Sequence, residues 1–135
     1  MVQVIQKALI TSALVTVVIA ISLVHVASAQ QNQEPKSQIT NSKYLTIKNL
    51  KFRAESFSNS ITGTIVNNST QQVSLVNVYA LLYDKDNLLI TVESGIADVS
   101  TLKPGEDSAF KISLFGLGSE TVDHYTILPG GTIGL

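Results

Sequence analysis

His124 offers the most obvious chemistry in the sequence, because it is the only histidine outside the apolar N-terminal segment. Asp123 precedes it and Ser119 lies nearby; a histidine, a carboxylate and a hydroxyl form a hydrolase triad when a fold brings them together. The sequence shows no nucleophile-elbow pattern, and one histidine without further ligands makes no zinc site. We therefore predict no catalytic residue, no metal site and no enzyme, and expect His124 on a sheet surface.

A second group of polar side chains, Asp84, Asp86 and Asn87, lies in one short segment. Ca²⁺ takes about 6–8 oxygen ligands, and this segment lacks both the glycine and the distal glutamate of a calcium loop. An aspartate at a strand end commonly accepts hydrogen bonds from the backbone of the turn that follows. We interpret the segment as a hairpin tip capped by Asp84, and expect no cofactor.

Composition narrows the classes of partner. Residues 30–135 contain 8 basic and 10 acidic side chains, a formal charge of −2. No run of basic residues stands out, which argues against nucleic acid and against an anionic lipid surface as partners. The chain has no cysteine, so it forms no disulfide and its stability must come from buried aliphatic side chains.

The N-terminal segment has the composition of an export signal. Residues 8–33 contain no Asp, Glu, Lys or Arg, and an apolar run ends in a small-x-small site, Ala27 and Ala29, directly before Gln30. This pattern predicts a signal peptide, residues 1–29, that is cleaved after Ala29. The alternative is an uncleaved membrane anchor, because the run is long enough to span a bilayer as a helix. Both interpretations place the remaining chain outside the cytoplasm, secreted or anchored at the outer face of the cell membrane.

The residues after this segment predict strands and no helix. Residues 30–43 are rich in Gln, Asn and Ser, which is typical of a flexible linker. From Tyr44 onward, apolar and polar residues alternate with the period of a strand, and turn residues separate the alternating segments. We predict an all-β, antiparallel sandwich of six or seven strands over residues 44–129, preceded by an N-terminal hydrophobic helix and followed by a glycine-rich tail at 130–135.

Two local irregularities are also expected. Within residues 44–52 the apolar residues change sides near Asn49, which predicts a β-bulge because one extra residue reverses the faces. Pro104 and Gly105 occupy the central positions of a predicted type II turn, where proline fixes φ and glycine supplies a positive φ.

The strongest predicted strand covers residues 73–84 and is apolar on both faces. We expect one face to enter the core. The other carries Tyr79, Leu81 and Tyr83. Either a phenylalanine from elsewhere in the chain covers this second face, the option that we favour, or the face is an interaction surface. The candidates for the cover are Phe52, Phe57 and Phe115.

Asn67 and Asn68 each begin an N-x-[ST] sequence in a predicted turn. In an exported protein such asparagines are candidate glycosylation sites, provided that the host glycosylates. The alternative, which we favour, is that both residues only form the turn through hydrogen bonds to their own backbone.

A set of residues spread over residues 44–128 resembles the FxLYD domain family: Gly63, Asn67, Leu82, Tyr83, Asp84, Pro104 and Gly105. Ala80 stands where that family has its leading phenylalanine. The resemblance implies a small immunoglobulin-like sandwich on a secreted or anchored prokaryotic protein. The hydrophobic pattern also resembles, more weakly, the water-stress domain of type 2 late-embryogenesis-abundant proteins. Neither family implies an enzymatic activity.

These observations predict an exported, non-enzymatic binding or structural module of the cell envelope. Its partner would be an envelope protein or polymer, with membrane contact through the N-terminal segment if that segment is not cleaved. One alternative is a stress-protective sandwich that contacts membranes or unstable proteins. Another is a small carbohydrate-binding module, against which the absence of tryptophan counts.

Overall fold

The computed structural model describes residues 34–55, 57–118 and 121–134. The predicted signal peptide or anchor, with its cleavage site at Ala27, Ala29 and Gln30, lies outside these residues. The described residues form strands and loops only. They accordingly contain no helix of the length and apolar character that crossing a membrane requires.

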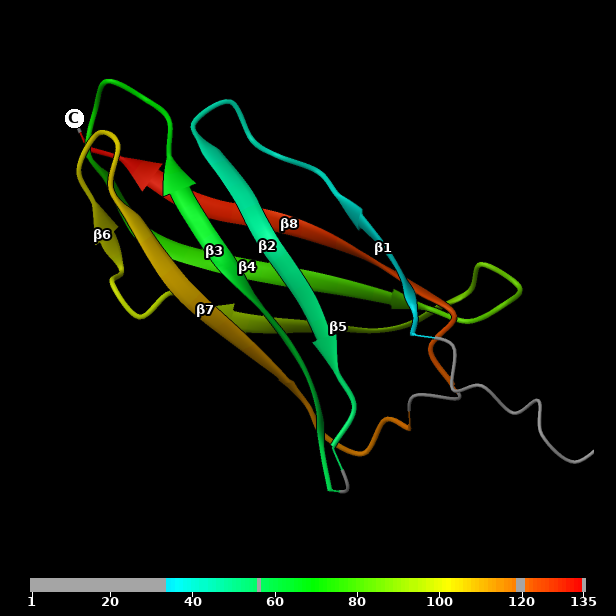
Figure 1. The fold of residues 1–135 in the computed structure, drawn as a ribbon. Coiled ribbons are helices and arrows are strands. Elements are labelled where there is room, and N and C mark those ends of the chain that lie inside the picture. Colours follow the sequence, from blue (N-terminus) through cyan, green and yellow to red (C-terminus); the bar gives the residue numbers. More distant parts are fainter. Residues whose placement is uncertain (1–33, 56, 119–120, 135) are drawn as a thin grey trace, which may run out of the picture. The chain divides into compact units, whose positions relative to one another are not determined.

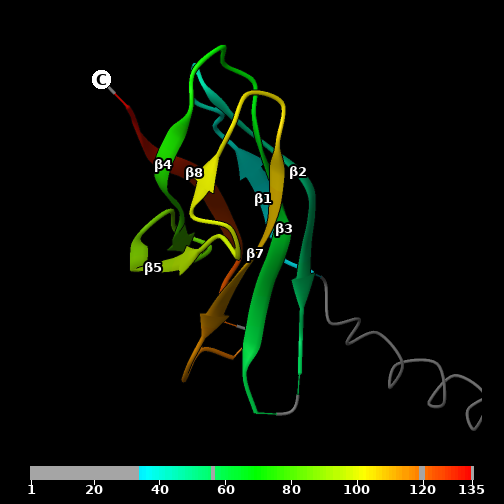
Figure 2. The same ribbon diagram turned by 90° about the vertical axis from the view of Figure 1, so that its left-hand side faces the viewer.

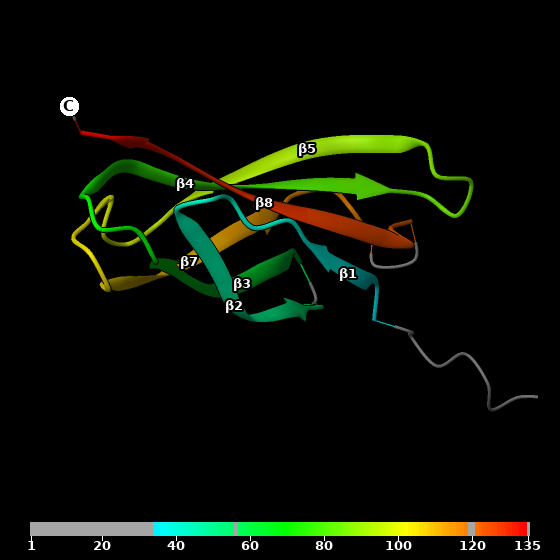
Figure 3. The same ribbon diagram turned by 90° about the horizontal axis from the view of Figure 1, so that it is seen from above.

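Eight strands follow one another in the described residues (Figure 1): β1 (Lys36–Ile39), β2 (Leu45–Arg53), β3 (Asn59–Asn67), β4 (Val73–Tyr83), β5 (Leu89–Ile96), β6 (Thr101–Leu102), β7 (Asp107–Leu114) and β8 (His124–Ile133). One sheet has the order β1-β8-β4-β5, with β6 paired to the start of β4. The other has the order β2-β3-β7. The two sheets lie in separate layers (Figure 3), so the all-β prediction is confirmed.

The hydrophobic core takes side chains from both sheets. From β4 it receives the predicted inner face: Val76, Val78, Ala80 and Leu82. From the three-stranded sheet it receives Ile61, Ile65, Ile112 and Leu114. These side chains alternate along their strands with exposed or half-buried ones, as strand geometry requires. The period of two in the sequence thus identified the buried faces.

The predicted β-bulge in β2 is confirmed. The pairing of β2 with β3 shifts between Lys48 and Lys51, and Asn49 has a positive φ of 53°. In a regular strand, residues five positions apart point to opposite faces. The extra residue of the bulge reverses the faces, so Ile47 and Phe52 are both buried.

The structure differs from the predicted flexible linker, because part of residues 30–43 forms β1. This strand runs parallel to β8 and pairs Lys36 with His124 and Ile39 with Ile127, so the larger sheet is mixed and not purely antiparallel. All four residues of β1 are exposed, and no apolar alternation marks the strand. Backbone hydrogen bonds hold it in place instead, among them the bond from Thr40 N–H to the Ile127 carbonyl at 2.9 Å.

The predicted glycine-rich tail also differs, because β8 continues through residues 129–133. Pro129 pairs with Val78 and Gly130 with Asn77 of β4. β1 ends opposite Ile127, so β8 is an edge strand from that point, where proline is tolerated. With β1 and the two-residue β6, the described chain has eight strands where six or seven were expected.

Candidate functional site

The second face of β4 forms the outer surface of the larger sheet. Tyr79 is 38% exposed there, and Leu81 and Tyr83 are half-buried. The strand register places Val92 opposite Leu81, Ile96 opposite Asn77, and Leu128 opposite Tyr79. Opposite residues of paired strands point to the same side of a sheet. We call the resulting surface the outer apolar face; it consists of Tyr79, Leu81, Val92, Ile96 and Leu128.

None of the three phenylalanines expected to cover this face does so. Phe57 is 100% exposed and Phe115 is 77% exposed, so neither lies under or over other side chains. Phe52 is buried in the core, where its ring centroid lies 6.0 Å from that of Tyr125. The expectation of a cover was therefore wrong, because two of these rings lie next to loops and the third points inward.

Neighbouring polar groups hold Tyr79 on the outer apolar face. The side-chain amide of Asn77 donates a hydrogen bond to the Tyr79 hydroxyl at 2.8 Å. A Cβ atom at Gly130 would lie 3.1 Å from the Tyr79 ring, so the glycine lets this ring approach the backbone of β8. The ring is thereby fixed in an exposed position, which lowers the entropy that it would lose on contact with a partner.

Beyond the outer apolar face, at the end of β4, Tyr83 stacks on His124. The ring centroids are 5.0 Å apart and the ring planes differ by 8°, while Nδ1 of His124 lies 3.0 Å from Oδ2 of Asp123. A shallow cleft of about 330 Å³ is lined by Asp123 and His124 together with Lys36 and Asn87. Within the described residues no hydroxyl is hydrogen-bonded to the His124 ring, and Ser119 is not among them. Within the described residues the arrangement shows no nucleophile beside His124.

The hairpin tip between β4 and β5 has the predicted cap. Oδ1 of Asp84 accepts hydrogen bonds from the backbone N–H groups of Asp86 at 2.8 Å and Leu88 at 2.9 Å. The carboxylate is thus occupied by the turn itself. Across the part of the chain that the structure describes, no three or more His, Cys, Asp or Glu side chains gather in a way that could hold a metal ion.

Asn67 is buried, and its side chain joins three segments of the chain by hydrogen bonds; it is not an exposed turn residue. Its amide nitrogen donates to the carbonyl oxygens of Gln71 at 2.8 Å and Leu102 at 2.9 Å. Its Oδ1 accepts from the N–H of Ser69 at 2.9 Å. The side chain is fully buried, so in the folded chain a glycosyltransferase has no access to it. Of the two candidate glycosylation sites only Asn68 is exposed.

The predicted turn at Pro104 and Gly105 packs against the same asparagine. Gly105 has a φ of 79°, and the N–H of Glu106 donates to the carbonyl of Lys103 at 3.0 Å, as a type II turn requires. The N–H of Gly105 donates to the backbone carbonyl of Asn67 at 2.9 Å. The motif residues Asn67, Pro104 and Gly105 are therefore structural.

The sequence reasoning missed a second surface, on the outside of the three-stranded sheet. Four basic side chains lie there, three on β2 and one on β7; they are exposed, and we call this surface the cationic face, defined by Lys48, Lys51, Arg53 and Lys111. These residues are scattered over more than sixty positions of the sequence, so no basic run marks them. The alternation along each strand shows which residues point outward. The pairing of β2 and β7 with β3 is also needed to show that the outward basic residues share one surface.

Comparisons with known proteins add no assignment to these surfaces. No family model matches the chain, and no curated protein and no solved structure matches it. The function therefore has to be argued from the residues on the two faces.

Proposed function

We propose that this chain is an exported, non-enzymatic binding module of the cell envelope, built on an immunoglobulin-like sandwich. It binds its partner through the outer apolar face. The observation that carries the proposal is the exposure of this face: Ile96 is 73% exposed and Val92 is 50% exposed, on either side of Ser94, which lies opposite Tyr79. Contiguous exposed apolar side chains on a folded domain mark an interaction surface.

The composition of the face favours a protein partner with an apolar strip. Tyrosine is among the side chains that contribute most to the centre of a protein interface, and Tyr79 lies on this face. A carbohydrate platform would require two coplanar tyrosine rings on the open face. The ring that stacks on Tyr83 belongs to His124, so the sugar-binding alternative gains no support.

The relation to the FxLYD family and the export of the chain remain parts of this proposal. The family resemblance rests on the sequence motif, including Leu82, Tyr83 and Asp84. The export signal is supported by the uncharged run and the small-x-small site before Gln30.

Photo-crosslinking in the native host tests the proposal. A photoreactive amino acid at Ile96 should yield a discrete crosslinked product in the envelope fraction. The same amino acid at Thr70, an exposed turn position outside the face, should not. Adding Val92→Ser should reduce the Ile96 product. Equal products from both positions, or a chain confined to the cytosol, would overturn the proposal.

A stress-protective role is the second candidate. The observation in its favour is that exposed apolar side chains continue into the adjoining hairpin, at Leu88, Leu89 and Ile90. Such a module would suppress the aggregation of heat-denatured proteins, which light scattering of a denatured client enzyme measures. Undiminished client aggregation at a severalfold molar excess of the chain would exclude this role.

A further inference from the structure

We propose that the cationic face is a binding site for a phosphodiester polymer that carries no bases, such as a polyol phosphate chain. The face lies on the outside of the three-stranded sheet, away from the outer apolar face, which lies on the other sheet. The two proposals therefore rest on different residues and can fail separately.

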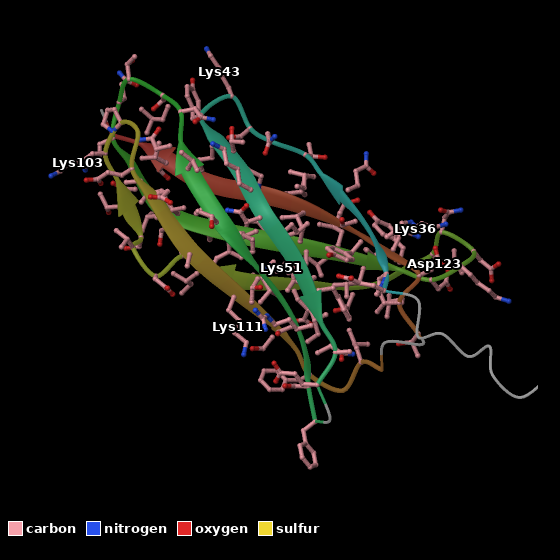
Figure 4. The ribbon with its side chains drawn as sticks, viewed as in Figure 1. Lys36, Lys43, Lys51, Lys103, Lys111 and Asp123 are labelled. Carbon is pink, nitrogen blue, oxygen red and sulfur yellow. The ribbon has the colours of Figure 1, made fainter. Side chains whose placement is uncertain are left out.

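The register arranges the basic residues on either side of β3. Lys51 and Lys111 both lie opposite Thr62 of β3, one on each side, and Lys48 and Arg53 continue the line along β2. Adjacent strands are about 4.8 Å apart, so Lys51 and Lys111 are separated by roughly 9.6 Å at the backbone. Figure 4 labels Lys51 on β2 and Lys111 on β7, and Figure 2 shows β3 between these two strands.

A shallow cleft of about 320 Å³ lies on this face. Its lining includes Lys51, Arg53 and Lys111 together with the hydroxyl-bearing side chains of Thr62 and Thr64. Ammonium and guanidinium groups at the sides and hydroxyl groups in the floor are all hydrogen-bond donors. This combination suits phosphate, whose oxygens accept several donors at once.

The charges on the face are available to a ligand. Within the described residues the one ion pair joins His124 and Asp123, so all four basic side chains lack an acidic partner there. Three carboxylates limit the site. Asp98 lines the cleft, and Asp107 lies opposite Val66 on the outer side of the sheet. Glu34 accepts a hydrogen bond from the N–H of Phe52 at 3.1 Å, at the edge of β2. The positive region is therefore the end of the sheet that holds Lys51, Arg53 and Lys111.

A buried hydroxyl on the same sheet adds an independent observation. Ser60 lies between Arg53 and Ser113 in the register. Its neighbour Ile61 points into the core, so the alternation of the strand turns Ser60 to the outer side. Its Oγ is buried and has no hydrogen-bond partner among the described residues. An unpaired buried donor is costly; Ser60 does not line the cleft, so an anion would accept from this hydroxyl only if the side chains that cover it move.

The dimensions favour a polymer that carries its charge in its own backbone. Lys51 and Arg53 are alternate residues of β2 and lie about 6.8 Å apart, which sets the spacing of the anions, and the space between β2 and Lys111 of β7 is narrow. An acidic peptide needs extra width for its side chains. Nucleic acid strands bind through bases stacked on exposed aromatic rings, and the aromatic residue that lines this cleft, Phe110, is buried.

Titration of the purified full chain with fluorescently labelled polyglycerol phosphate tests the proposal. The double variant Lys51→Gln/Lys111→Gln should bind at least tenfold more weakly than the native chain. The matched control Lys85→Gln/Lys103→Gln removes the same charge from exposed positions elsewhere and should bind within twofold of the native chain. The slope of log K against log salt should fall by roughly 1.4 in the first variant, taking the single-strand value for two phosphate contacts.

Three outcomes would overturn the proposal. Equal losses in the two double variants would show that only net charge matters. Binding of polyglutamate as tight as that of polyglycerol phosphate would remove the preference for phosphate. Binding of oligothymidylate as tight as that of polyglycerol phosphate would show that bases are accepted. Circular dichroism of each variant controls for folding.

Discussion

The side-chain amide of Asn67 donates a hydrogen bond to the carbonyl oxygen of Leu102 at 2.9 Å, across 35 positions of the sequence. The backbone carbonyl of Asn67 accepts from Gly105 in the turn that follows Leu102. One asparagine at the end of β3 thus holds the segment that connects β6 to β7. This links the two sheets, because β6 belongs to the larger sheet and β7 to the smaller one.

Asn67→Ala is expected to destabilise the chain by about 2–4 kcal/mol. The substitution leaves the carbonyl of Leu102 buried without its donor, which costs about 1–3 kcal/mol. It also removes the part-buried hydrogen bond to the carbonyl of Gln71, which is worth about 1 kcal/mol. Urea unfolding followed by circular dichroism measures the change. Asn68→Ala, at an exposed neighbouring position, should cost less than about 1 kcal/mol. Equal losses for both variants would contradict the role given to Asn67.

Asp84→Ala should destabilise the hairpin by about 1 kcal/mol, because two backbone N–H groups lose their acceptor. Asp84→Asn keeps an oxygen in the same position and should retain most of the stability. Asp86→Ala serves as the control at the tip. Thermal unfolding of the three variants measures their stability. If Asp84→Asn lost as much stability as Asp84→Ala, the charge of Asp84 and not its hydrogen bonds to the turn would be the stabilising feature.

Gly95→Ala is expected to cost about 1–3 kcal/mol, the usual penalty for overpacking. A Cβ atom at this position would lie 3.0 Å from the backbone carbonyl carbon of Lys111 and even closer to its oxygen, so β5 could not cross β7 as it does. Gly134→Ala is the control, since nothing lies within 4 Å of its added carbon. Chemical denaturation of both proteins measures the difference, and similar midpoints would show that β5 can shift freely.

Alkaline pH should weaken the native fold through Tyr125. Its side chain is 2% exposed, and burial raises the pKa of its phenol above the ordinary 10.0. Above pH 10.0 the unfolded chain loses this proton while the folded chain keeps it. The free energy of unfolding is therefore unaffected by Tyr125 below pH 10.0 and falls as the pH rises toward the higher pKa of the folded chain. Tyr125→Phe should remove this part of the loss. Free energies of unfolding between pH 9 and 12 test it, and parallel curves for the two proteins would refute it.

The buried parts of this fold could be predicted because a strand with one buried face has an apolar residue at every second position. The inner face of β4 and the bulge at Asn49 follow from where apolar residues fall. Turn chemistry similarly placed the cap at Asp84 and the turn at Gly105. In each case the feature depends on residues that are close together in the sequence, within one turn or within one strand.

What could not be predicted depends on pairing between distant segments. The four residues of β1 are exposed, so their side chains give no sign of a strand. β1 forms because its backbone pairs with that of β8. The cationic face exists only because β3 brings Lys51 and Lys111 to the two sides of Thr62. The exposure of the outer apolar face likewise required knowing that Phe57 and Phe115 lie away from it.

The parallel pairing of β1 with β8 has a consequence for the order in which the chain matures. Lys36 and His124 are paired although they are 88 positions apart (124 − 36), and β8 also separates β1 from β4. The larger sheet therefore lacks its middle until residues 124–133 have left the ribosome. A nascent chain that still lacks these residues cannot close this layer, so β1 has no strand to pair with until synthesis is nearly finished.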